Sequence, residues 1–333
     1  DWYETVKDAW VLRLAISSPE AFRVKYARNH KALRDPDAVG AAFVARRQDV
    51  VGHFLHIDDG NLVSRGRYAQ EPADTEAMID YITGQANSDT REIDHVLFVA
   101  HGALQRAEDV AARVKAWRQV FRRNRIYPLH LMWETGFNNQ VVDVVKDLLL
   151  KTKVRMTKDD PLVDARLEEL ARPLGRKLWR DLKTTARLSV DPAGRAGQVL
   201  EDIITAAGPL KLHFLSQSAG VLLFAEFLRV IAARGHVLET ATLMAPACSL
   251  EDYEAKIRPH IRSTVKEVTQ FSLIQSREEA DSLDVYGKSL LYLVSNAIEA
   301  RTKTPLLGLA EYLDGYALPE GHQLLLAGKD SRT

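Results

Sequence analysis

A short stretch in the second half of the chain has residue types and spacing suited to nucleophilic catalysis: Ser216, Gln217, Ser218, Ala219 and Gly220. An apolar run, residues 211–215, precedes it, and an amphipathic segment, residues 221–233, follows it. This context is typical of a nucleophile elbow, in which a tight strand-to-helix turn lifts one hydroxyl above a sheet. Small residues on both sides of Ser218 would let the two backbones approach closely, although glycine is usual at the first position. We therefore predict a nucleophilic Ser218; the alternative is an ordinary serine N-cap.

Three further residues, His101, Gly102 and Ala103, directly follow another apolar run, residues 95–100. A glycine here lets the chain turn sharply, so that the backbone N–H of Ala103 could face the nucleophile. Paired with the N–H of Ala219, it would form an oxyanion hole for a tetrahedral intermediate. His101 is not expected to be the general base, because its place in the chain order does not suit that role.

The elements that would position these residues alternate between apolar runs and amphipathic helices from about residue 73 onward. Buried parallel strands are expected at the continuous apolar runs 95–100, 128–133, 212–215, 240–244, 268–274 and 323–326. Helices are expected at about 106–124, 138–151 and 219–233. This alternation predicts the α/β class, with a doubly wound, mostly parallel sheet and helices on both faces.

Two regions depart from this alternation. Residues 1–72 are predicted to form an N-terminal helical segment, about 1–49, followed by an edge hairpin with strands at 50–56 and 62–68. Within the main domain, residues 73–333, the stretch 152–208 has no strand-like run and is longer than a crossover needs. We expect a helical insertion there, which is either a lid or a helical excursion that does not move.

The composition excludes several classes of protein. The 45 Lys and Arg residues balance 45 Asp and Glu residues, which argues against a nucleic-acid binder that neutralises phosphates. No stretch approaches the roughly 18–20 apolar residues of a membrane-spanning helix. The single cysteine, Cys248, excludes an internal disulfide and permits a reducing compartment, so a cytoplasmic location is expected. The chain begins at Asp1 without a methionine, which suggests part of a longer protein.

Together with the elbow and the His-Gly turn, two longer segments carry a resemblance to a known family: YPLHLMWETG at 127–136 and YGKSLLYLVS at 286–295. The chain resembles the α/β-hydrolase superfamily and, more narrowly, a group of bacterial α/β-hydrolase proteins, over roughly residues 90–333. The resemblance implies a nucleophile, an acid and a histidine in that chain order, and hydrolysis of esters or related acyl compounds. It implies neither a metal nor an organic cofactor, and it does not specify a substrate.

The same resemblance indicates where the remaining catalytic residues should lie. The acid is expected just after the run 268–274, where Asp281 best matches the acidic position of the resembling group, with Asp284 and Glu279 as alternatives. The histidine is expected after the run 323–326, but none follows there, and His322 precedes that run. Either the base lies beyond Thr333, which we favour, or the protein does not use a triad.

These observations predict a serine hydrolase of esterase or lipase type that acts on a small-molecule or lipid-like ester. An amidase, a peptidase or an acyltransferase could use the same residues, and a non-catalytic interaction module with the hydrolase fold is the alternative of another class. The histidines of residues 53–59 do not predict a metal site, because His53 and His56 would point to opposite faces of a strand.

Overall fold

The computed structural model describes residues 45–136, 161–281 and 286–327, which form an α/β structure around one eight-stranded sheet. The strand order is β2-β1-β4-β3-β5-β6-β7-β8, and only the pair β1–β2 is antiparallel. The strands are β1 (Phe54–Asp58), β2 (Asn61–Leu62), β3 (His95–Ala100), β4 (Ile126–Trp133), β5 (Lys211–Gln217), β6 (Leu238–Met244), β7 (Val265–Leu273) and β8 (His322–Ala327). The predicted α/β class and the mostly parallel sheet are confirmed.

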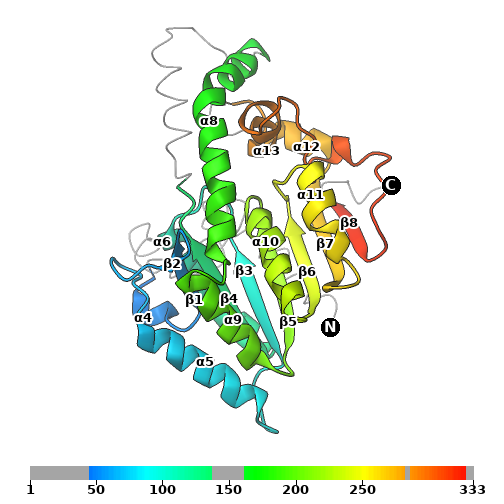
Figure 1. The fold of residues 1–333 in the computed structure, drawn as a ribbon. Coiled ribbons are helices and arrows are strands. Elements are labelled where there is room, and N and C mark those ends of the chain that lie inside the picture. The colour runs from blue at the N-terminus through cyan, green and yellow to red at the C-terminus, as the bar shows by residue number, and fades with distance from the viewer. Residues whose placement is uncertain (1–44, 137–160, 282–285, 328–333) are drawn as a thin grey trace, which may run out of the picture.

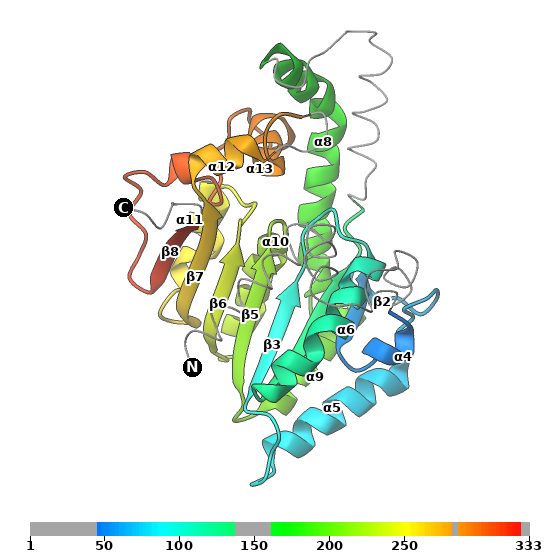
Figure 2. The same ribbon diagram turned by 180° about the vertical axis from the view of Figure 1, so that it is seen from behind.

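Helices lie on both faces of this sheet (Figures 1 and 2). They are α4 (Arg47–Val50), α5 (Pro72–Ala86), α6 (Ala107–Arg123), α8 (Pro161–Ser189), α9 (Arg195–Ala207), α10 (Gly220–Ala233), α11 (Leu250–Lys256), α12 (Gln275–Ala280) and α13 (Leu290–Leu293). Helices α9 and α10 cover one face, and α6 lies on the other, against β4. No helix in the described ranges is both long and apolar enough to cross a bilayer.

Helix α10 anchors the centre of the fold. Most of its residues are buried, because it packs directly on β3 and β5. Phe227 of α10 contacts Phe98 of β3 and Phe214 of β5, with ring centroids 5.0 and 4.9 Å apart. Since α10 begins at the end of β5, this packing holds the β5–α10 turn against the carboxyl end of β3.

The region before β3 differs from the expected hairpin. Val50 belongs to the short helix α4, the first strand begins only at Phe54, and the second strand is confined to Asn61–Leu62. The cause is Gly52, whose φ of +84° turns the chain between helix and strand. Residues 1–44 and 138–151, for which helices were expected, lie outside the described residues.

The expected insertion contains two helices, α8 and α9. Helix α9 packs beside α5 on one face of the sheet, whereas α8 extends past the ends of the strands (Figure 1). The hydrogen bonds that hold α8 to the chain between α12 and β8 include those from Tyr286 Oη to Glu168 (2.7 Å), from the Gly287 N–H to Asp164 (2.8 Å) and from Trp179 Nε1 to Glu299 (2.9 Å). These bonds tie α8 to the same segment that closes over the carboxyl edge of the sheet.

Candidate active site at the carboxyl edge of the sheet

Ser218 occupies the turn between β5 and α10 in a conformation that serine rarely adopts. Its φ is +49°, in the left-handed region that costs energy for a residue with a side chain. Two hydrogen bonds fix this backbone: the Ser218 N–H donates to Met244 O (2.8 Å), and the Ala247 N–H donates to Ser218 O (3.1 Å). The turn is therefore held in a strained conformation by the neighbouring strand end.

Two small residues allow this turn to form. A Cβ added to Gly220 would lie 2.4 Å from the carbonyl oxygen of Ala100, so only glycine fits where α10 crosses the end of β3. Ser216, in register with Ala100, is fully buried. Both positions flank Ser218 as expected for an elbow, and they press it against the loop that follows β3.

That loop, residues 101–103, has all three of its carbonyl oxygens bound. Trp133 Nε1 donates to His101 O (3.2 Å), His101 Nδ1 donates to Gly102 O (2.8 Å), and Thr135 Oγ1 donates to Ala103 O (2.7 Å). In a trans peptide the N–H points opposite to the C=O, so the Ala103 N–H is directed away from the His101 ring. The peptide orientation of the loop is thus fixed by its own histidine and by the end of β4.

The loop and the elbow lie side by side. A Cβ on Gly102 would lie 3.2 Å from Ser218 Cβ and 3.8 Å from Ser218 Oγ. Across residues 45–136, 161–281 and 286–327, no acceptor receives a hydrogen bond from the N–H of Ala103 or of Ala219. Two unbonded N–H groups from two segments next to one hydroxyl could bind a developing oxyanion.

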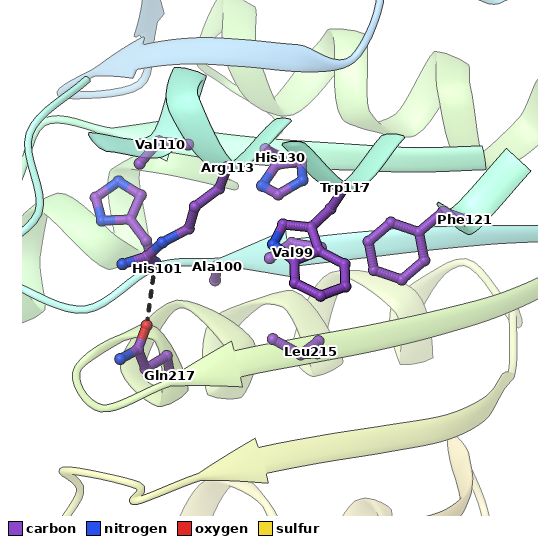
Figure 3. A pocket seen from close by; sticks show the side chains of 10 residues that line it. All are labelled: Val99, Ala100, His101, Val110, Arg113, Trp117, Phe121, His130, Leu215 and Gln217. Carbon is purple, nitrogen blue, oxygen red and sulfur yellow. Dashed lines mark hydrogen bonds between the residues drawn. The ribbon is translucent and has the colours of Figure 1, made fainter. Parts of the chain in front are cut away.

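His101 is a neutral residue that supports the loop. Its side chain is buried, and burial lowers the pKa of His101 to about 4. Because the Gly102 carbonyl can only accept, Nδ1 carries the proton. Its Nε2 is buried and has no hydrogen-bond partner among the described residues. The residue lines a second, small pocket (Figure 3). His101 therefore orients the Gly102–Ala103 peptide rather than acting on the Ser218 proton.

Ser218 opens into a cavity of about 570 Å³. The walls come from the carboxyl ends of β6, β7 and β8 and from α12 and α13, and they are largely apolar: Met244, Ala245, Phe271, Leu273, Ala280, Leu290, Leu291 and Ala327. The polar part includes the carboxyl groups of Glu278 and Asp281. A cavity of this size and lining suits an organic molecule with a substantial apolar part.

The four acidic residues after β7 have different positions. Asp281 ends α12 at the rim of the cavity, and partial burial raises its pKa. Glu279 is exposed and accepts from Gln275 Nε2 (2.9 Å), outside the cavity lining. Asp284 lies outside the described residues.

Glu278 is a cavity residue that the sequence reasoning missed. Its side chain is only 2% exposed, and burial, with a smaller contribution from the Asp281 charge, raises the pKa of Glu278 to about 7. A signal was present in the sequence, because a helix beginning near 275 places residues 278 and 281 on one face at i, i+3 spacing.

The histidines of the described residues lie elsewhere. His322, the first residue of β8, is hydrogen-bonded to Tyr253 Oη (2.6 Å) and to Gln270 Oε1 (3.1 Å). Ala327, which lines the cavity, is five residues further along the same strand, about 17 Å away. No described histidine lines the Ser218 cavity.

His53 and His56 are both hydrogen-bonded to other parts of the fold. His53 Nδ1 donates to Pro128 O (2.9 Å), and His56 is bonded to Tyr68 O (2.9 Å) and to Glu134 (2.8 Å). Among the described residues, no group of three or more His, Cys, Asp or Glu side chains is arranged to hold a metal ion.

Comparison of the chain with protein-family models, with curated proteins and with solved structures finds no match. The geometry of the Ser218 site therefore carries the functional argument.

Proposed function

We propose that the protein is a serine hydrolase of the α/β-hydrolase type that cleaves carboxylic esters with small or lipid-like acyl groups. The observation that carries the proposal is the positive φ of Ser218, held at a strand-to-helix turn beside two unbonded N–H groups. Strained backbone at such a turn is the geometry of an exposed serine nucleophile, and one N–H comes from the loop after β3, as that architecture requires.

In the proposed reaction, Ser218 Oγ attacks the ester carbonyl carbon as its proton passes to a histidine base. The N–H groups of Ala103 and Ala219 stabilise the oxyanion of the tetrahedral intermediate. The alcohol then leaves with the proton from the histidine, and water, deprotonated by the same base, releases the acid from the acyl-enzyme. None of these steps requires a cofactor.

The acid that orients the base is proposed to be Asp281, with Glu278 as the alternative. Stabilising an imidazolium requires an ionised carboxylate. At neutral pH the pKa of about 7 leaves Glu278 half protonated, which favours Asp281 at the cavity rim. Glu278 beneath it would then tune the charge of the pair.

The experiment is hydrolysis of p-nitrophenyl esters from acetate to laurate by this chain and by a version that continues past Thr333, which could supply the base. Ser218→Ala should abolish the activity. Ser272→Ala, which changes another serine lining the cavity, should retain it. Activity that survives Ser218→Ala would overturn the proposal.

A non-catalytic module with this fold is the second candidate, since no histidine of the described residues lines the cavity. Inactivity of both versions on esters, together with inactivity on p-nitroanilides, would favour it. Hydrolysis of the anilides alone would instead indicate an amidase or peptidase that uses the same site.

A further inference from the structure

Three polar side chains meet directly beside the proposed site. Gln217 is the last residue of β5 and immediately precedes Ser218, Gln105 lies in the loop after Gly102, and Arg113 lies on α6. Gln105 Nε2 donates to Gln217 Oε1 (2.8 Å). Arg113 Nη1 donates to the same oxygen (3.2 Å), as Figure 3 shows, and also to Gln105 Oε1.

The side-chain oxygens of Gln105 and Gln217 accept hydrogen bonds from the Arg113 guanidinium. Burial lowers the pKa of Arg113 to about 10, so it stays charged at neutral pH. In the described part of the chain, no carboxylate forms an ion pair with Arg113: the Asp109 charge acts on it only at longer range, and Asp109 is paired with Arg106 instead. A buried charge is costly without hydrogen bonds, so the two glutamine oxygens and the guanidinium depend on one another.

The pocket that adjoins these three side chains is too small to be a ligand site. Its volume is about 30 Å³, room for about two water molecules, and its walls include Val99, Trp117, Phe121 and Leu215. Figure 3 shows Arg113 extending along this pocket toward Gln217. The hydrogen bonds therefore act between segments of the protein.

We propose that Arg113 is a positioning residue. It acts as a lock that holds the oxyanion loop, residues 101–103, against the nucleophile elbow, residues 216–220, through Gln105 and Gln217. The two N–H groups of the oxyanion hole come from segments more than a hundred residues apart, at Ala103 and Ala219. Gln105 also donates its own N–H to Gly102 O (3.3 Å), so a shift of Gln105 moves the Gly102–Ala103 peptide. The lock sets the distance between the two donors. This inference rests on the proposed function.

The first test replaces the guanidinium with an uncharged side chain of similar length. Arg113→Met should lower kcat and the rate of Ser218 labelling by a fluorophosphonate by about 10- to 100-fold, because an error of about 1 Å in positioning costs that much. KM should change less than threefold, and Arg113→Lys should recover part of the loss. Arg123→Met, at the exposed end of the same helix, is the matched control and should behave as wild type.

The second test does not depend on catalysis, so it separates failure of the lock from failure of the proposed function. Arg113→Met and Gln105→Leu should each accelerate amide hydrogen exchange in both peptides 101–106 and 215–221, and the double variant should add little to either. Acceleration in one peptide only, or additive effects of the two substitutions, would overturn the lock. Should Arg113→Met fold poorly, Gln105→Leu, at a half-buried loop position, carries the same comparison.

Discussion

Substitution of Gly220 by alanine tests the close approach of the elbow to the Ala100 carbonyl oxygen at the end of β3. The added Cβ would lie 2.4 Å from Ala100 O, whereas ordinary contacts begin at 3.4 Å, so β3 and the start of α10 must separate by about 1 Å. That displacement would also move Ser218 and the Ala219 N–H relative to the oxyanion loop. We expect about a 100-fold loss of kcat and a destabilisation of about 1–3 kcal/mol from overpacking.

The matched control is Gly84→Ala, which makes the same change inside helix α5. A Cβ on Gly84 would meet nothing within 4 Å. Alanine should therefore stabilise the protein there by about 0.5–1 kcal/mol through helix propensity alone, with no effect on activity. The free energy of unfolding from urea titration and the rate of ester hydrolysis measure both effects. If Gly220→Ala were as stable and as active as wild type, the account of a tightly held elbow would be refuted.

Two further predictions concern titratable groups near the site. Burial raises the pKa of Glu278 from 4.5 to about 7, so the folded protein binds this proton more tightly than the unfolded chain does. Glu278 therefore lowers the free energy of unfolding when it is ionised, an effect that is absent below about pH 4.5 and complete above about pH 7. Glu278→Gln should thus raise the unfolding free energy by up to about 3 kcal/mol at pH 8 and by little at pH 4; equal gains at both pH values, or a similar gain from the exposed Glu279→Gln, would contradict this. The pKa of His101, lowered to about 4, predicts that its contribution to stability is present above about pH 6.5 and is lost as the pH falls toward 4. His101→Leu should remove that dependence and also lower kcat about tenfold or more by freeing the Gly102 carbonyl, whereas His101→Asn, which can still donate, should lose less; equal losses in the two variants would refute the positioning role.

The central strands could be predicted from the sequence because they are buried on both faces. The run expected at 95–100 is β3 (His95–Ala100), and β4 to β8 each begin one to three residues before their expected runs. A parallel strand covered by helices on both faces is apolar along its whole length, so a continuous apolar run bounded by turn residues indicates such a strand. The strand expected to begin at Val50 was wrong at its start, because a short apolar run such as Val50-Val51 can equally belong to a helix. Val50 ends α4, and the chain turns at Gly52 before β1 begins.

The elbow was visible in the sequence because strand, turn and helix are consecutive there. Its supporting contacts were not, because they join residues distant in the chain. Glu278 is 2% exposed and accepts a backbone hydrogen bond from Ser289, eleven residues further along the chain. Its burial is a property of tertiary packing that local spacing only hints at. Gln105 and Gln217 are 112 residues apart, and no pattern in either segment indicates that they meet.

Covalent labelling of the protein by a fluorophosphonate, with the adduct mapped by peptide mass spectrometry, tests the central claim most directly. An activated serine in an oxyanion hole should react at Ser218, with one adduct per chain that Ser218→Ala abolishes. The version that continues past Thr333 should be labelled in parallel, so that a base supplied there is included. An adduct on another serine, or no adduct in either version, would contradict the account.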